Sequence, residues 1–185
     1  MSKQTIRDEL DAYGQAVASS SPSTMQRLRP GLADGAIDQL ETEHFLVIPD
    51  DARAIWKWHD GEEEARPLTF VASGRFLPLE EGILAGRKLL AGRRDAHTDP
   101  RPGAVWVQLI AGMGPGLCVE IQGSSCFVVL ADPASPVTDF PIVAIDELIR
   151  LWTGVLKCGA WTLSANGAWS WNFDRYPALP EGHLL

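Results

Sequence analysis

The chain has 185 residues, of which 45% are hydrophobic and 22% are charged. This composition is typical of a folded domain and excludes a chain that is disordered over most of its length. Twenty-four acidic residues against 16 basic ones give a formal charge of -8. Such a charge disfavours nucleic acid and anionic membranes as partners, and it favours a basic protein.

Residues 1–27 are predicted to form an N-terminal helical extension. Apolar side chains recur there at intervals of three or four residues: Ile6, Leu10, Tyr13 and Val17. This spacing predicts one amphipathic helix. Ser21 is expected to cap a short second helix, because Pro22 suits a first helical turn, where its missing N–H is not needed.

Two more helices are expected before residue 62, one beginning near Asp34 and one after Pro49. Their apolar sides consist of Ile37, Leu40 and His44 in the first, and of Ala52, Ile55, Trp56 and His59 in the second. Trp56 and Trp58 lie about 200° apart around the helix, so one is expected in the core and the other at its rim. Gly61 is expected to be the left-handed stop of that helix, with Asp60 bonding the loop that follows.

The middle of the chain is predicted to hold a helix and then a sheet. The helix begins at Pro78 and has an apolar side made of Leu79, Ile83 and Leu90. An exposed loop is expected at 91–103. Runs of β-branched and apolar residues separated by glycine turns predict an antiparallel meander at 105–110, 117–121 and 126–131. A short strand is also expected at 68–71.

The most regular helical pattern begins at Ile145 and ends at Gly159. Helices that come first and a sheet that follows predict the α+β class. We therefore expect N-terminal helices packed against a mostly antiparallel sheet, with a further helix before a C-terminal hairpin. Residues 177–185, which contain Pro180 and Gly182, are expected to form a loose tail.

A Trp-rich hairpin is predicted at 162–176, because Asn-Gly at 166–167 is a strong signal for a two-residue turn. In that register Thr162 pairs with Trp171, and Ser164 pairs with Trp169. Trp161 and Leu163 then lie on the opposite face. One face is expected to join the core and the other to form a contact surface, for a partner or for a second copy.

The sequence contains no recognisable catalytic or metal-binding motif. The glycine-rich run 112–116 lacks the Gly-Lys-Ser/Thr of a phosphate-binding loop, and no Gly-x-Ser-x-Gly occurs. Four histidines are scattered (His44, His59, His97 and His183), and three cysteines are expected to be reduced, buried thiols (Cys118, Cys126 and Cys158). We expect no enzyme activity, no cofactor and no metal. A secretory leader is not evident, so a cytoplasmic protein is expected.

The order of several motifs over residues 28–161 resembles the SUKH superfamily. The opening signature runs from Leu28-Arg29-Pro30-Gly31 through Ile48-Pro49-Asp50-Asp51 to Trp56 and His59-Asp60-Gly61. Later pieces are the run 76–81, Trp106 at the start of the meander, the glycine-rich turn before Cys118-Val119-Glu120, and the helix that ends in Cys158-Gly159. Four residues of this pattern are expected to be structural: Trp56, Asp60, Gly61 and Trp106.

This superfamily includes a fungal regulator of cell-wall synthesis and many bacterial immunity proteins. The resemblance therefore implies a non-catalytic binding module, and the most direct expectation is an immunity protein that neutralises a basic toxin domain such as a nuclease. The charge of -8 agrees with that partner, because an acidic inhibitor can occupy a basic cleft. The helix before Ser19 and the hairpin after Ala160 are additions to the family pattern.

Partner contacts are expected at the acidic run Glu62-Glu63-Glu64 and at Trp169 and Trp171 of the hairpin. The chain itself is expected to be a monomer or a weak homodimer. Two other interpretations stay open. One is a regulatory interaction domain linked to the cell envelope, and the other is an enzyme or small-ligand-binding protein with a pocket between the sheet and Trp56.

Overall fold

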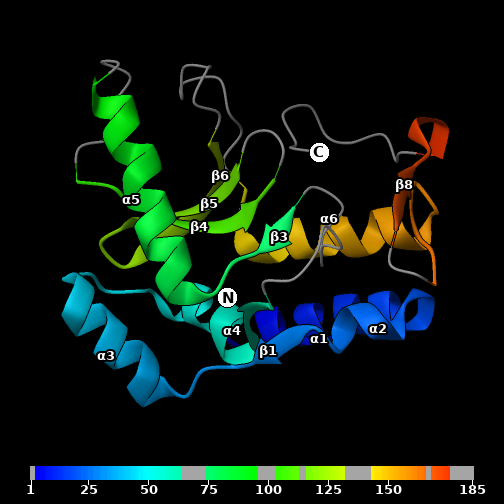
Figure 1. The fold of residues 1–185 in the computed structure, drawn as a ribbon, viewed down its shortest axis with the longest axis horizontal. Coiled ribbons are helices and arrows are strands. Elements are labelled where there is room, and N and C mark those ends of the chain that lie inside the picture. The colour runs from blue at the N-terminus through cyan, green and yellow to red at the C-terminus, as the bar shows by residue number, and fades with distance from the viewer. Residues whose placement is uncertain are drawn as a thin grey trace.

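The computed structural model describes residues 3–63, 74–95, 103–112, 116–131, 143–165 and 168–175. Its helices are α1 (Lys3–Ser20), α2 (Pro22–Met25), α3 (Asp34–His44), α4 (Asp50–Trp58), α5 (Leu79–Asp95) and α6 (Ile145–Lys157). Its strands are β1 (Leu28–Pro30), β2 (His59–Glu62), β3 (Arg75–Phe76), β4 (Val105–Ala111), β5 (Gly116–Gln122), β6 (Ser125–Ala131), β7 (Trp161–Leu163) and β8 (Trp169–Trp171). A 3-10 helix, η2, spans Phe173–Arg175. The predicted α+β class is confirmed (Figure 1).

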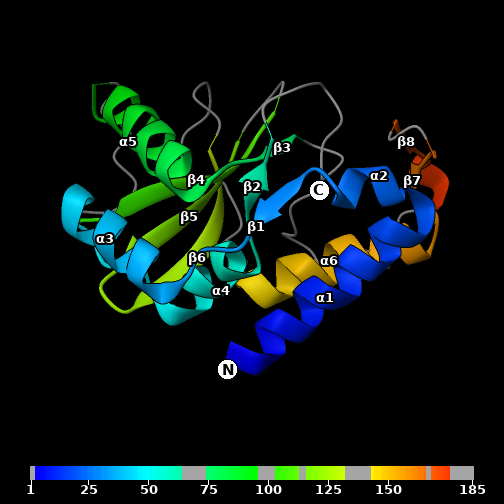
Figure 2. The ribbon, with the colours of Figure 1, turned by 60° about the horizontal axis from the view of Figure 1, so that its bottom comes forward.

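The central element is an antiparallel sheet with the strand order β3-β4-β5-β6. The predicted meander is therefore confirmed, and Val143 extends it by a bridge to Val128 of β6. Two small antiparallel pairs, β1-β2 and β7-β8, lie outside this sheet. The α5 helix lies on one face of the sheet, and α1, α4 and α6 lie on the other (Figure 2).

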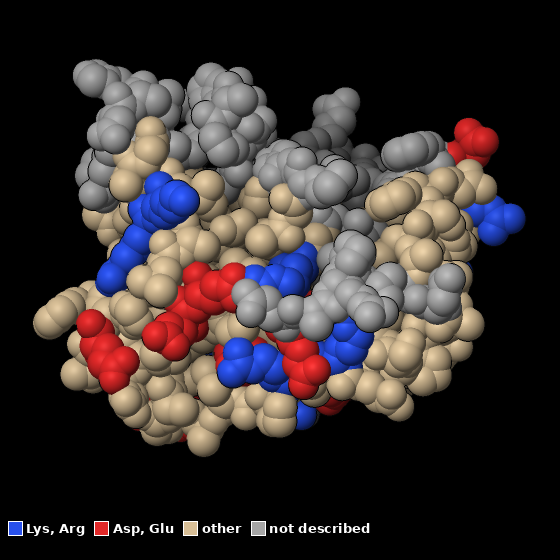
Figure 3. All heavy atoms as spheres, viewed as in Figure 1, with Lys and Arg blue, Asp and Glu red and all other residues tan. Residues whose placement is uncertain are grey.

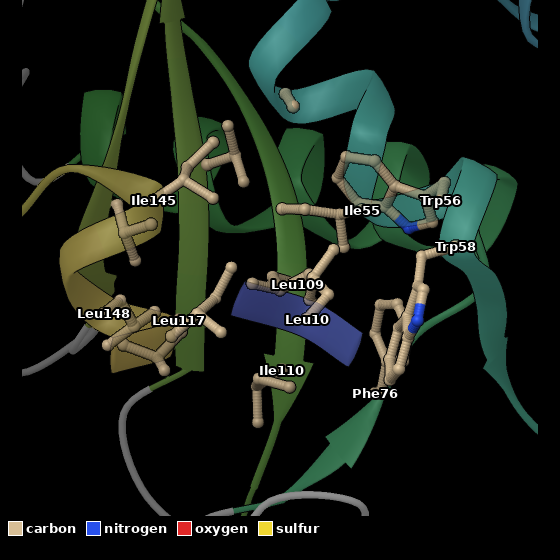
Figure 4. Packing of buried hydrophobic residues seen from close by; sticks show 14 of the residues in the cluster. Leu10, Ile55, Trp56, Trp58, Phe76, Leu109, Ile110, Leu117, Ile145 and Leu148 are labelled. Atoms are coloured by element: carbon tan, nitrogen blue, oxygen red, sulfur yellow. The ribbon is translucent and has the colours of Figure 1, made fainter. Parts of the chain in front are cut away.

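The main core lies between the sheet and the three helices α1, α4 and α6. All four apolar residues that predicted the first helix are buried, and α1 packs beside α6 (Figure 2). Leu10 of α1, Ile55 of α4 and Leu148 of α6 converge on Leu109 of β4 (Figure 4). The N-terminal helix thus belongs to the same core as the sheet.

Trp58 of α4 is buried under α1. The prediction that one of the two tryptophans of this helix lies at the rim of the core is therefore wrong. The Trp58 indole N–H donates to Asp11 of α1 at 2.7 Å, and Trp56 is buried as well. The rim prediction fails because the angle between the two tryptophans around α4 does not show that a second helix covers Trp58. The covering side chains come from α1, about 47 positions earlier in the chain.

A second, smaller apolar cluster fills the other face of the sheet and consists of Leu90, Trp106, Cys118 and Val129. The α5 helix crosses β4 so closely that a Cβ on Gly86 would lie 2.1 Å from the carbonyl oxygen of Trp106. Only glycine permits that approach. The α5 helix continues to Asp95, so the predicted loop from Ala91 is wrong for its first five residues.

The helix-capping predictions are partly confirmed. The α2 helix begins at Pro22 after Ser21, but the Ser21 hydroxyl makes no capping hydrogen bond. Instead it lies 3.1 Å from the Ser23 hydroxyl and 3.5 Å from the carbonyl oxygen of Ala165 in the hairpin. The expected strand at 68–71 and the tail 177–185 lie outside the described residues.

The hairpin has a different register from the predicted one. Thr162 pairs with Ser170, and Ser164 and Ala168 close a three-residue loop. A shift of one residue moves every side chain of a strand to the other face. The apolar residues Trp161, Leu163, Trp169 and Trp171 therefore share one face, and the prediction of aromatic groups on both faces is wrong.

Candidate functional site

Three of the residues that carry the resemblance, Trp56, Asp60 and Gly61, lie at one junction between β2 and the start of α5. The indole N–H of Trp56 donates to the carbonyl oxygen of Leu77 at 3.2 Å. The Asp60 carboxylate accepts the backbone N–H of Leu79, the first residue of α5, at 2.8 Å. This junction is buried, so its residues hold elements together and are not available to a partner.

Gly61 has a φ of 74°, as a left-handed position requires, but it does not stop the helix. The α4 helix ends at Trp58, and Gly61 lies inside β2. The predicted role is therefore wrong, although the predicted backbone conformation is right. A Cβ at this position would lie 2.3 Å from the backbone nitrogen of Pro78, so glycine is required by the neighbouring segment as well as by φ.

Asp60 places a titratable carboxyl group in this buried junction. Burial raises its pKa, while the hydrogen bond from Leu79 and the nearby Arg29 guanidinium lower it. The Arg29 Nη2 atom lies 3.3 Å from the Asp60 carboxylate. The net effect is a raised pKa, because burial, together with a smaller contribution from the charge of Glu80, outweighs the two favourable contacts.

Trp106 holds a buried carboxylate on the α5 face of the sheet. Its indole N–H donates to Glu120 at 3.0 Å, and the Gln122 amide donates to the other oxygen of the same carboxylate at 3.0 Å. Trp106 and Glu120 are fully buried. Their structural role agrees with the expectation for Trp106.

The predicted acidic contact loop is wrong for Glu62, which is 2% exposed and pairs with Leu28 as part of β2. One of its carboxylate oxygens lies 3.5 Å from the backbone N–H of Phe76. Burial, and then the charge of Glu62, raise the pKa of Tyr13 well above its ordinary value. Glu63 is exposed, and Glu64 lies outside the described residues.

The two hairpin tryptophans are less buried than the rest of their face. Trp169 is half-buried, and its ring packs edge-on against Trp161 with the centroids 5.9 Å apart. Trp171 is 50% exposed. The hairpin stands at the far end of α6, away from β2 (Figure 2), so the structure does not bring these tryptophans together with Glu63.

The ligand-binding interpretation expects a pocket between the sheet and Trp56, but the cavity in the core lies beside Trp58 and is not lined by Trp56. The core holds a cavity of about 10 Å³ among apolar side chains of α1, α4, α6 and the sheet (Figure 4). This is about the space of one water molecule. A metabolite does not fit in it.

The histidines and cysteines of the described residues form no cluster that could hold a metal ion. His59 Nδ1 lies 2.8 Å from the carbonyl oxygen of Arg29, and His44 lies beside Arg87 of α5. Cys118 is buried and Cys126 half-buried, but Cys158 is exposed, so the prediction of buried thiols is wrong for Cys158. His97 and His183 lie outside the described residues. None of the helices in the described part of the chain is long and apolar enough to cross a membrane.

An exposed apolar surface that was not predicted from the sequence lies on the segment between α3 and α4. The run 45–48 alternates, because Leu46 and Ile48 are buried whereas Phe45 is 94% exposed and Val47 is 71% exposed. Among the described residues these are the most exposed large apolar side chains. The available signal was the run of four consecutive apolar residues at 45–48, because a short run at the surface cannot bury both of its sides against one core.

This surface is strongly acidic. Residues 34–58, which form α3, the turn and α4, contain six carboxylates and two cations. Their formal charge of -4 is half of the chain's total of -8. Figure 3 shows acidic side chains gathered on the side of the molecule where α3 and the start of α5 lie. We call the exposed residues Asp38, Thr42, Glu43, Phe45 and Val47, together with the partly buried Glu41, the α3–α4 surface.

Three ion pairs, made by two cations of α4, join α3 to α4 at this surface. The Arg53 guanidinium binds the carboxylates of Asp38 and Glu41, and the Lys57 ammonium lies 2.8 Å from Asp34. Both cations of the segment therefore face carboxylates of α3. The remaining charge of the segment is negative.

The chain has no match among known protein-family models or among curated proteins.

Proposed function

We propose that this chain is a non-catalytic protein-binding module, an immunity protein that neutralises a basic toxin domain such as a nuclease. The observation that carries the proposal is the exposure of Phe45 and Val47 in the middle of the acidic α3–α4 surface. Large apolar side chains that stand together in water are typical of surfaces that a partner covers.

The charge around these two side chains selects the kind of partner. Half of the chain's net charge lies within residues 34–58. A nuclease presents a basic cleft to its substrate, and an acidic surface can occupy that cleft and guide the approach of the two proteins. A nucleic acid would be repelled by the same surface.

The resemblance to the SUKH superfamily supports the same proposal. The residues that carry it, among them Trp56, Asp60, Gly61 and Trp106, are buried and join structural elements. These residues stabilise the fold, so we expect the exposed surfaces to determine which partner binds. A regulatory domain linked to the cell envelope would use the same scaffold, so the identity of the partner separates the two interpretations.

The test begins with capture of partners by the tagged full chain from a lysate of its native cell, followed by mass spectrometry. The captured protein is then expressed in a host cell, alone and together with the chain. We expect a basic protein, bound in equal amounts, that stops growth alone and is harmless with the chain. A captured protein that is harmless alone, or a retained metabolite in place of a protein, contradicts the proposal.

A further inference from the structure

We infer that Phe45 is a preformed anchor that enters an apolar pocket rimmed by lysine and arginine side chains on the partner. This inference rests on the proposed function, since it specifies how the α3–α4 surface binds. It commits to a basic protein with an apolar pocket, and not to a second copy of this acidic chain. In a contact between two copies, the same carboxylates would face and repel each other.

The first argument is the backbone conformation of Phe45. It lies directly after the last residue of α3 with φ of 51° and ψ of 50°. The N–H of Leu46 donates to the backbone carbonyl oxygen of Glu41 at 3.1 Å, and the N–H of Phe45 donates to that of Thr42 at 3.4 Å. These two bonds define a Schellman helix end, in which the left-handed position is usually glycine.

Phe45 gains nothing from the fold at this position. A left-handed backbone is unfavourable for a residue with a side chain, and a side chain that is 94% exposed recovers almost nothing through burial. Glycine would be the better residue for stability alone. A large aromatic side chain at this position is therefore explained by a contact outside the chain.

The turn that presents Phe45 is held in place by its neighbours. The Glu41 carboxylate accepts the N–H of Ile48 at 2.6 Å, across the whole turn, and lies 3.7 Å from Arg53. Leu46 and Ile48 are buried on either side of Val47. A side chain on a preordered turn loses little conformational entropy on binding, which is the property of an anchor residue.

The charges near Phe45 fix the rim of the partner's pocket. Glu41, Glu43 and Asp38 lie on the last turns of α3, and Glu43 is exposed. Arg87 of α5 is a nearby cation, and its guanidinium donates to the carbonyl oxygen of His44. Cations around the pocket would face these carboxylates when the ring is inserted. Aromatic anchors enclosed by a polar rim carry most of the affinity in many protein interfaces.

A library of short random peptides displayed on phage serves as the probe, selected against the full chain. We expect enriched peptides that combine Lys or Arg with aliphatic or aromatic residues. A synthetic copy of one such peptide is then titrated by fluorescence anisotropy. Phe45→Ser is expected to weaken its binding by roughly tenfold or more. Glu43→Gln is expected to weaken it at low salt and to have less effect at high salt.

Two matched variants test whether the effect is specific to this surface. Leu84→Ser removes an exposed apolar side chain outside the α3–α4 surface and should leave binding unchanged. Phe45→Gly removes the ring and relieves the backbone, so it should lose binding while its melting temperature stays equal or rises. The inference is overturned if the library yields no binders, or if the enriched peptides are acidic or uncharged. It is also overturned if the peptide still binds both Phe45 variants. If the Phe45→Gly variant still neutralises the captured toxin, the inference is overturned as well, but the proposed function is not.

Discussion

The carboxylate of Asp60 in β2 accepts the backbone N–H of Leu79, the first residue of α5, at 2.8 Å. The first N–H groups of a helix have no partner within the helix, so this contact supplies a cap from a residue 19 positions away. It joins the β1-β2 pair to the helix that covers the central sheet. The junction is thus held by a capping bond and by the Trp56 indole on Leu77.

Loss of this cap should be measurable as a loss of stability. Asp60→Ala removes the acceptor and is expected to lower the free energy of unfolding by about 1–2 kcal/mol. Asp60→Asn keeps a side-chain oxygen at the same place and should cost less. Urea denaturation of the two variants and the wild type checks the order. An alanine variant as stable as the asparagine variant would show that the bond to Leu79 contributes nothing.

The raised pKa of Asp60 predicts a pH dependence with a definite sign. The folded state binds the proton more tightly than the unfolded state, in which the pKa is about 3.9. This residue therefore stabilises the fold more as the pH falls through its raised pKa, and the gain is complete below the unfolded value. We expect the stability of the wild type relative to Asp60→Asn to increase as the pH is lowered from neutral towards 4. A relative stability that falls over this range contradicts the raised pKa.

We predict that Gly61 tolerates no side chain, because its φ is positive and because Pro78 occupies the space of a Cβ. Gly123 provides the control, since its φ is 59° and a Cβ there would meet nothing within 4 Å. Gly123→Ala should cost about 1 kcal/mol, the price of the left-handed backbone alone. Gly61→Ala should cost clearly more, because its Cβ would collide with Pro78. Equal melting temperatures for the two variants would refute the collision.

Local patterns in the sequence predicted the buried faces of the helices well. The helical spacing of Ile6, Leu10, Tyr13 and Val17 and that of the α6 residues identified the sides that are buried. The meander followed equally from β-branched runs between glycines. These features depend on side chains a few residues apart, and periodicity reports on such neighbours directly.

Features that depend on distant residues could not be predicted in this way. Gly61 faces Pro78, Trp58 is covered by α1, and Glu62 is enclosed between β1 and the segment at Phe76. The exposure of Phe45 could not be predicted either, because sequence alone does not show which side of a short apolar run meets the core. The α3–α4 surface therefore emerged only from the fold.

The three cysteines are expected to react at different rates with a thiol reagent. Cys158 is exposed and should react first in the native protein. Burial raises the pKa of Cys126 to about 11, so little of its reactive thiolate is present near neutral pH. Cys118 is buried and should react only on unfolding. Labelling followed by peptide mass spectrometry checks this order, and a Cys158→Ser variant should lose the fast phase. Rapid labelling of Cys118 would contradict the packing of the sheet.

The register of the hairpin can be tested by a pair of charges on its exposed face. Thr162 and Ser170 are directly opposite, with their hydroxyl oxygens 2.6 Å apart. Thr162→Glu and Ser170→Lys, made singly and together, form a double-mutant cycle for this pair. Opposite charges across an antiparallel pair stabilise by roughly 0.2–1 kcal/mol, so a favourable coupling of that size is expected, decreasing with salt.

The two-residue turn that Asn-Gly favours leads to a different outcome for the same cycle. In that register Thr162 is opposite Trp171, and residues 162 and 170 lie on opposite faces of the hairpin. The two charges would then show no coupling, and Ser170→Lys alone would place an ammonium on the face that holds the buried Trp161 and Leu163. A large loss of stability in Ser170→Lys with no coupling would therefore establish the two-residue turn. A tolerated Ser170→Lys with a favourable coupling establishes the register in which all three hairpin tryptophans share one face.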